Sequence, residues 1–316
     1  MDHKQLGKSG IALPPIMFGA NVFGWTADAV TSFKLLDALA DAGLNAIDTA
    51  DAYSRWVPGH TGGESEAIIG VWLKQRGGRD KLIIATKVGI DLGPGKSGLS
   101  KTRIVAAVEA SLTRLQTDYI DLYQAHRDDE QTPLQETLEA FGALIKAGKV
   151  RAIGASNYSA ARLREALDVS AAHGLPRYES LQPHYNLMER RIFEDALEPL
   201  CLAEDVGVIN YYGLASGFLS GKYRSEADLG KSARGQAVKK YLNPRGTKVL
   251  DALDATAARL GATAAQVALA WLIARPSVTA PIASATNLEQ VAELVRAAVL
   301  RLDAEAIATL DEASQE

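Results

Sequence analysis

The sequence predicts one α/β domain of the (β/α)8 TIM barrel type, with an N-terminal hairpin and an extra C-terminal helix. Eight short apolar runs rich in β-branched residues recur along the 316 residues, with amphipathic, Ala- and Leu-rich stretches between them. No linker rich in Pro, Gly or Ser separates these units. A doubly wound open sheet would want a G-x-G-x-x-G turn after the first run, and Gly19-Ala20-Asn21 lacks that spacing. One closed parallel barrel over residues 1–316 is therefore the favoured architecture.

The expected elements begin with a hairpin around Gly7 and Gly10. The eight strands are expected to end at Phe18, Ile47, Thr86, Tyr123, Ile153, Gln182, Tyr211 and Pro281. Three of the helices between them follow recognisable start signals, which are Ser100 for 101–114, Thr132-Pro133 for 134–147, and Asn157 with Ser159 for 160–172. The last helix, over 303–313, is expected to pack on the outside of the barrel.

Composition and charge exclude several classes of protein. With 47% hydrophobic and 23% charged residues the chain has enough apolar side chain for a large core. A net charge of −4 argues against general binding to nucleic acid or to a membrane surface, since both need a strongly basic face. Cys201 is alone, so no internal disulfide is possible, and its apolar neighbours predict a buried helical position. Without a signal-peptide pattern or a run of about 20 apolar residues, a cytoplasmic location is expected.

Two connections are unusually long. Residues 51–63 contain Tyr53, Trp56 and Pro58, and residues 212–247 carry most of a basic cluster. Eight Lys or Arg lie between Lys222 and Lys248, against two acidic residues. Long structureless loops in a compact domain tend to act as lids or binding loops. A solvated charged face is the plainer interpretation of such a cluster, but its place after a barrel strand favours anion binding.

Four ionisable side chains are placed where barrel strands end. Asp48, Lys87 and His126 follow three predicted strands, and Tyr53 lies in the loop after Asp48. The carboxyl ends of barrel strands converge on one face, so these groups are expected to meet. Taken singly, each has a structural explanation: a turn cap, a surface charge, a loop histidine or a packed aromatic.

Together these groups suit carbonyl chemistry. Hydride reduction of a carbonyl leaves an alkoxide that needs a proton, and a tyrosine with a pKa of about 10 is a poor acid or base near neutrality. A nearby ammonium lowers the pKa of the phenol, and a carboxylate keeps that ammonium charged and oriented. Asp48, Lys87 and Tyr53 can supply this relay. The imidazole of His126 can hold the carbonyl oxygen.

Seven segments resemble the signatures of the aldo-keto reductase family, in the family's order and over nearly the whole chain. They are residues 48–53 (DTADAY), 86–87 (TK), 121–126 (DLYQAH), 154–157 (GASN), 182–186 (QPHYN), 211–223 (YYGLASGFLSGKY) and 282–290 (IASATNLEQ). The resemblance implies that Tyr53 is the general acid, that Lys87 and Asp48 tune it, and that His126 orients the carbonyl. It also implies reversible hydride transfer between a nicotinamide cofactor and a small-molecule carbonyl or alcohol.

The same resemblance implies the cofactor site. Ser156, Asn157 and Gln182 would bind the nicotinamide carboxamide, since they combine donors and acceptors, and Tyr211 would stack on the ring. Asn157 is also expected to cap the next helix. Small residues after the seventh strand would let backbone N–H groups approach the pyrophosphate. The further expected cofactor contacts are Gly19, Ala20, Asn21, Asp48, Tyr212, Gly213, Leu214, Ala215, Gly217, Leu219, Lys222, Arg224, Ser284, Thr286 and Gln290.

The chain departs from the family pattern at the positions that select cofactor and substrate. Gln290 aligns where many members place an arginine for the 2′-phosphate, and Asn287 stands where a lysine is common. The basic loop can compensate, so NADPH is favoured over NADH. Arg127 replaces a frequent tryptophan, and it and Trp56 are expected at the substrate pocket. Arg127 would favour an anionic substrate, although a salt bridge to Asp128 or Asp129 is the plainer expectation.

Two rival functions are weaker. A Schiff-base lyase would use Lys87 but would leave Ser156, Gln182 and Tyr211 without a task. A cofactor-binding subunit that senses redox state with little turnover would keep the cofactor residues, and the retained tetrad argues for turnover instead. The five histidines show no metal-binding spacing, so no metal is expected. No particular carbonyl compound and no oligomeric state is predicted.

Overall fold

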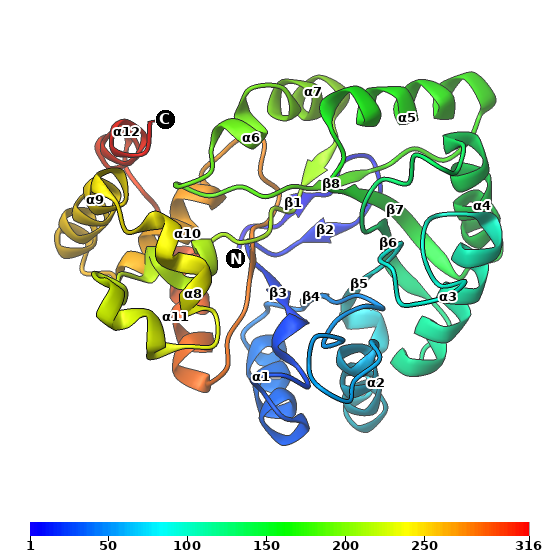
Figure 1. Cartoon of the computed structure of the whole chain (residues 1–316), viewed down its shortest axis with the longest axis horizontal. Helices are drawn as coiled ribbons and strands as arrows, with labels where there is room; N and C mark the ends of the chain where they lie inside the picture. The colour runs from blue at the N-terminus through cyan, green and yellow to red at the C-terminus, as the bar shows by residue number, and fades with distance from the viewer. Residues whose placement is uncertain (316) are drawn as a thin grey trace.

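Eight parallel strands form the centre of the molecule, with helices arranged around them (Figure 1). The structure is a computed structural model, and it describes residues 1–315. The strands are β3 Met17–Gly19, β4 Ala46–Asp48, β5 Ile83–Val88, β6 Ile120–Ala125, β7 Val150–Ser156, β8 Ser180–Gln182, β9 Gly207–Val208 and β10 Ile282–Ala283. They pair in the order β10-β3-β4-β5-β6-β7-β8-β9. This confirms the predicted sequence of βα units.

Backbone hydrogen bonds join the two ends of this sheet. The amide of Thr279 donates to the carbonyl of Val208 at 2.8 Å, and the amide of Ile282 donates to the carbonyl of Asn210 at 2.9 Å. The segment that leads into β10 therefore lies along β9, and the sheet curls into the predicted (β/α)8 barrel. Observed strand ends lie within three residues of those expected. At Tyr211 the chain forms only an isolated bridge to His184.

The N-terminal hairpin covers the end of the barrel at which the strands begin. β1 (Lys4–Gln5) pairs antiparallel with β2 (Ala12–Leu13). Its buried Leu6, Ile11 and Leu13 form one apolar cluster with strand residues that include Ala46, Ala85 and Ala152. Small side chains inside the strands leave room for these larger ones. The barrel is thus filled with apolar side chains at this end, and polar groups gather at the other.

The helices cover the outside of the barrel. They are α1 Ala29–Asp41, α2 Glu64–Arg76, α3 Lys101–Leu115, α4 Leu134–Lys146, α5 Ala160–His173, α6 Arg191–Glu194, α7 Leu197–Glu204, α8 Gly235–Val238, α9 Pro244–Leu260, α10 Ala264–Ile273, α11 Leu288–Val299 and α12 Ala304–Ala313. Ser100 and Ser159 accept hydrogen bonds from the backbone as N-caps, as predicted. The expectation that Asn157 also caps a helix is wrong. Ser159 takes that position, and Asn157 has a left-handed backbone with φ of 58°.

The basic connection after β9 is not structureless, contrary to expectation. It folds into η3 (Ala215–Ser220), η4 (Glu226–Lys231), α8 and η5 (Lys239–Tyr241). Buried apolar side chains, including Phe218, Leu229 and Val238, hold these short helices on the barrel. The residues 51–63 form turns without a helix. The apolar residues of the connection after β9 have no regular period. Hydrophobic periodicity therefore did not predict its short helices.

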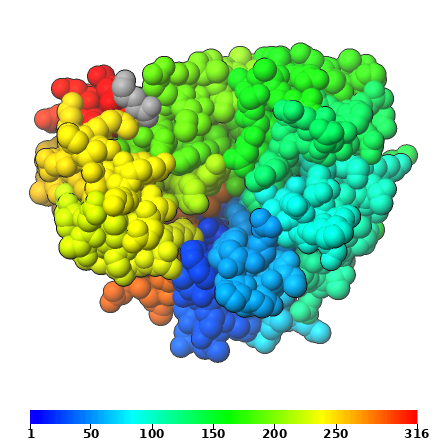
Figure 2. Space-filling model, viewed as in Figure 1, coloured from blue at the N-terminus to red at the C-terminus, as the bar shows by residue number. Residues whose placement is uncertain are grey.

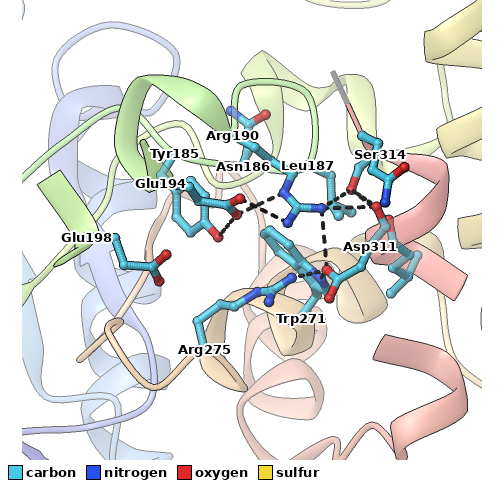
Figure 3. A network of polar contacts seen from close by, with 12 residues as sticks. Tyr185, Asn186, Leu187, Arg190, Glu194, Glu198, Trp271, Arg275, Asp311 and Ser314 are labelled. Carbon is cyan, nitrogen blue, oxygen red and sulfur yellow. Dashed lines mark hydrogen bonds and ion pairs between the residues drawn. The ribbon is translucent and has the colours of Figure 1, made fainter. Parts of the chain in front are cut away.

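The C-terminal helix α12 lies outside the barrel, as predicted, and is tied to the loop after β8 by polar contacts (Figure 3). The guanidinium of Arg190 donates to the Glu194 carboxylate, to the Asp311 carbonyl and to the Ser314 hydroxyl. The indole of Trp271 donates to the Asp311 carboxylate at 2.8 Å, and Arg275 pairs with the same carboxylate. These contacts also fix the loop that follows Gln182.

Two further findings concern residues 1–315. No single helix there is long and apolar enough to cross a membrane, and only the bent pair α9 and α10 passes such a test jointly. Within the same range no group of His, Cys, Asp or Glu is arranged to hold a metal.

Cys201 is buried in α7, as predicted, and burial raises the pKa of its thiol to about 12. A thiol that stays protonated is a poor nucleophile.

Candidate functional site

Lys87 is the centre of the polar cluster at the carboxyl end of the barrel. Its Nζ lies 2.7 Å from Asp48 Oδ2, 2.8 Å from Tyr53 Oη and 2.8 Å from the carbonyl of Thr49. These contacts use all three ammonium hydrogens. Lys87 is fully buried, and Asp48 is 1% exposed. The predicted Asp, Lys and Tyr therefore meet, and the ammonium is held by a carboxylate on one side and a phenol on the other.

Tyr53 is brought to this cluster by the turns after β4. Ser54, with φ of 70°, donates its hydroxyl to the carbonyl of Phe23 at 2.5 Å, which anchors the turn to the loop after β3. The Tyr53 hydroxyl donates to Asp48 Oδ2 at 3.2 Å. A left-handed non-glycine residue is strained, and such strain is typical of functional loops. Tyr53 is the one member of the trio whose side chain is only half-buried.

The protonation of Tyr53 corrects one expectation. Burial, and then the Asp48 carboxylate, raise the pKa of Tyr53 well above its usual value. We expected the Lys87 ammonium to lower that pKa, and the net direction is the opposite. Burial also lowers the pKa of Lys87, while Asp48 opposes that change. Because the phenol loses its hydration and faces a carboxylate, Tyr53 is held in its protonated form, the form that can donate a proton.

His126 lies beside this phenol as a neutral imidazole. The ring centroids of His126 and Tyr53 are 6.0 Å apart. Burial, followed by the charges of Lys87, Arg127 and Arg55, lowers the pKa of His126 well below its usual value. Its Nδ1 has no hydrogen-bond partner within residues 1–315. The backbone holds the residue in place, since its amide donates to the carbonyl of Val88 at 2.8 Å.

The three residues expected to bind a carboxamide form a connected network. Ser156 Oγ donates to the Gln182 carbonyl at 2.9 Å, and Asn157 Nδ2 donates to Ser156 Oγ at 3.0 Å. Tyr211 Oη donates to Asn157 Oδ1 at 2.8 Å. Gln182 Nε2 donates to Asp48 Oδ1 at 3.0 Å, which links this network to the ion pair. The ends of β7, β8 and the segment after β9 thus present amide groups and an aromatic ring together.

Gln124 belongs to this network, although the sequence analysis did not single it out. Its Nε2 donates to Asp48 Oδ1 at 3.4 Å, and its Oε1 accepts from Gln182 Nε2 at 3.4 Å. In the sheet register Gln124 is the partner of Lys87 on the neighbouring strand. Correct pairing of the two predicted strands would have placed it at the site.

Several further residues expected to contact the cofactor lie at the ends of β3 and β10. Ser284 Oγ donates to Asn21 Oδ1 at 2.9 Å. A Cβ at Gly19 would lie 2.8 Å from both the Ile282 side chain and Ser284 Oγ, so a larger residue there would force these side chains to shift. Gln290 Oε1 accepts from the amide of Thr286 at 2.7 Å, and Asn287 caps α11.

The segment after β9 has a strained backbone. Tyr212, Ala215, Ser216 and Gly217 have φ of 57°, 47°, 59° and 97°. Several of its N–H groups are engaged within the segment, because the amide of Ala215 donates to the Tyr212 carbonyl at 2.7 Å and that of Gly217 to the Leu214 carbonyl at 2.8 Å. The pyrophosphate contact that the sequence resemblance implied here stays a prediction. The charges offered by the segment are mostly engaged, and Arg224 pairs with Asp254 at 2.7 Å.

The two expected substrate residues have different surroundings. The Trp56 ring, 46% exposed, lies 6.2 Å from the Tyr53 ring and 5.6 Å from the Trp25 ring. Arg127 is exposed, and the expected salt bridge to Asp128 or Asp129 is wrong. The Asp128 carboxylate pairs with Arg162 at 2.9 Å. The Asp129 carboxylate accepts from Thr132 Oγ1 and the Leu99 amide.

A parallel eight-stranded barrel with a buried Asp–Lys pair against a tyrosine is the arrangement of a barrel oxidoreductase. Residues 15–315 match the model of the Aldo/keto reductase family. The chain belongs to that family of oxidoreductases.

Similar proteins agree with this membership over almost the full length. The chain is 34% identical to the uncharacterized oxidoreductase YrpG of Bacillus subtilis, over 99% of this chain and 95% of that protein. It is 32% identical to the L-glyceraldehyde 3-phosphate reductase of Escherichia coli, over 94% of this chain and 87% of that protein. It is also 34% identical to a probable voltage-gated potassium channel subunit beta of Arabidopsis thaliana, over 94% of this chain and 91% of that protein.

Proposed function

We propose that the protein reduces aldehydes or ketones to alcohols with NADPH, and that Tyr53 is the proton donor. The observation that carries this proposal is the contact of the Tyr53 hydroxyl with both Lys87 Nζ, at 2.8 Å, and Asp48 Oδ2, at 3.2 Å. A phenol placed between a buried ammonium and a carboxylate has its proton and its charge controlled by protein groups. A merely structural tyrosine needs neither partner.

The chain's residues have distinct tasks in this mechanism. When bound, NADPH supplies the hydride. Ser156, Asn157 and Gln182 would bind its carboxamide. His126, whose ring lies beside that of Tyr53, would orient the carbonyl oxygen towards Tyr53, which donates its proton to that oxygen. Lys87 then stabilises the phenolate left behind, and this is the step at which its ammonium acts on the tyrosine.

The test is consumption of NADPH or NADH by the purified protein with a panel of aldehydes and ketones. Turnover with a saturable dependence on the carbonyl compound is expected. Because one relative is named a reductase of L-glyceraldehyde 3-phosphate, the panel includes triose phosphates alongside sugar-like, aromatic, aliphatic and steroid carbonyls. Failure to bind either cofactor would refute the proposal.

A second candidate function is a cofactor-binding module that senses redox state with little turnover. The observation that favours it is the similarity to proteins named as potassium channel subunits. Tight binding of NADPH with slow release of NADP+, and no turnover on any carbonyl compound, would support this candidate. The complete Asp48, Tyr53, Lys87 and His126 set favours the reductase. One domain over residues 1–316 and a cytoplasmic location remain parts of the same proposal.

Gln290→Arg is expected to increase the preference for NADPH over NADH about tenfold. An arginine at the start of α11 would give the 2′-phosphate a charge-assisted hydrogen bond, worth about 1.4 kcal/mol or more. Gln290 now accepts from the Thr286 amide, so the variant loses a local contact. The measurement is KM for each cofactor, with NADH as the internal control. A parallel change for both cofactors would show that the position does not contact the phosphate.

The pH profile of carbonyl reduction is expected to be level. The pKa of Tyr53 is raised well above 10.0, so the proton donor keeps its proton up to that pH. The pKa of His126 is lowered well below 6.5, so the imidazole stays neutral down to that pH. Between these limits kcat/KM should change by less than about twofold. A midpoint inside that window would mean that a different group is the acid.

A further inference from the structure

Arg234 directly precedes α8 and is half-buried, and none of the carboxylates in residues 1–315 forms an ion pair with it. Other basic residues of the same connection do have such partners. Arg224 pairs with Asp254, Lys231 with Asp228, Lys239 with Glu226, and Lys240 with Glu189. A half-buried guanidinium without an anion costs free energy, and an anionic ligand would offset that cost.

The Arg234 guanidinium lies against aromatic rings that lead to the proton donor. Its Cζ is 5.2 Å from the centroid of the Trp25 ring. The Trp25 ring is 5.6 Å from the Trp56 ring, which in turn is 6.2 Å from the Tyr53 ring. The charge of Arg234 acts on the Tyr53 hydroxyl, because it opposes the rise in the pKa of that phenol. Arg234 therefore belongs to the mouth of the site.

The charges of two further arginines act on His126. Arg55 and Arg127 both lower the pKa of His126, so their charges reach its ring. Neither pairs with a carboxylate in the described part of the chain. Arg55 donates to the carbonyl of Asp91 at 2.5 Å. The charges of three arginines thus act on Tyr53 or His126 in a chain whose net charge is −4. Figure 2 shows a recess where the segment around α8 (yellow) faces the loops after β3 and β4 (blue).

We propose that Arg234, stacked on Trp25, binds a carboxylate or phosphate carried by the carbonyl substrate, and so selects anionic aldehydes. This rests on the reductase function proposed above. An anion could also come from the cofactor, because Arg234 lies in the same connection after β9 as the expected pyrophosphate contacts at Leu214–Leu219. Its position over the Trp25 ring favours the substrate instead. The Trp25 and Trp56 rings follow β3 and β4 and lead to Tyr53, the position of the substrate carbonyl.

The test compares anionic aldehydes with neutral counterparts, and in the first pair the two compounds have similar shapes. 4-Oxobutanoate is set against its methyl ester, and glycolaldehyde phosphate against glycolaldehyde. Wild-type kcat/KM is expected to favour the anion roughly 10–100-fold, the range of a charge-assisted hydrogen bond. The larger ratio of the two pairs identifies the anion. Arg234→Gln should bring the ratio close to one, and Arg234→Lys should keep part of it.

The controls separate this inference from the function on which it rests. Lys239→Gln removes a positive charge from the same connection and should leave the ratio unchanged, since Lys239 pairs with Glu226 at the surface. In the wild type, butanoate but not butanamide should inhibit competitively with the aldehyde. Equal losses for acid and ester in Arg234→Gln, or a higher KM for NADPH alone, would overturn the inference. Absence of turnover by the wild type on every carbonyl compound would instead overturn the proposed function.

Discussion

Tyr53→Phe is expected to lower kcat for carbonyl reduction by about 100–10,000-fold, the usual contribution of a positioned general acid. The phenyl ring keeps the contacts with Trp56 and His126 and loses only the hydroxyl. The nearest other groups are poor substitutes: in the variant Lys87 is still buried and bonded to Asp48 and to the Thr49 carbonyl, and burial holds the imidazole of His126 neutral. The loss should appear in kcat, because the proton is transferred only in the transition state.

Cofactor binding is the control for this variant. NADPH affinity, measured by fluorescence titration, should stay within about twofold of the wild type, because the expected cofactor residues lie on β7, β8 and after β9. Trp56→Phe is the matched control for cofactor affinity alone, since it alters the same loop without removing a contact of the ion pair. A Tyr53→Phe protein with unchanged kcat would show that the proton comes from elsewhere. Lost affinity for NADPH would show that the change had disturbed the fold of the site.

Periodicity and strand order were enough to predict the barrel. Each strand is an apolar run bounded by turns, and the carboxyl ends of parallel strands share one face whatever their length. Asp48, Lys87 and His126 could be placed together on that ground alone. The direction in which the pKa of Tyr53 is shifted could not be predicted from the sequence. That depends on how completely Lys87 and Asp48 are buried, and burial is a property of the packed barrel.

The residues that sequence reasoning missed are those whose position depends on tertiary packing. Gln124 comes to Asp48 through the register of β5 and β6, which hydrophobic periodicity does not set to the residue. Trp25 and Arg234 are far apart in the chain and meet only because the connection after β9 folds back on the loop after β3. The salt bridge expected of Arg127 failed for the same reason, since the long-range partner Arg162 takes Asp128.

Asp48→Asn is expected to destabilise the fold by about 3–5 kcal/mol, the cost of removing one partner of a buried ion pair. Lys87 has no exposed surface, and Asp48 is the only carboxylate bonded to it within residues 1–315. The asparagine is nearly the same size, so packing is conserved and the charge is the main change. The measurement is the free energy of unfolding from urea denaturation. Carbonyl reduction should fall as well, because burial already lowers the pKa of Lys87 and the loss of Asp48 removes the group that opposes it.

The double variant Asp48→Asn with Lys87→Met separates stability from chemistry. Methionine fills the volume of the lysine stem without a charge, so no buried ammonium is left unpaired, and most of the lost free energy should return. Turnover should not return, since the phenolate of Tyr53 would have no ammonium at 2.8 Å to stabilise it. Recovery of both stability and activity would mean that the ion pair serves the fold alone. Recovery of neither would mean that the hydrogen bonds of Asp48 to Gln182 and Gln124, rather than its charge, hold this end of the barrel together.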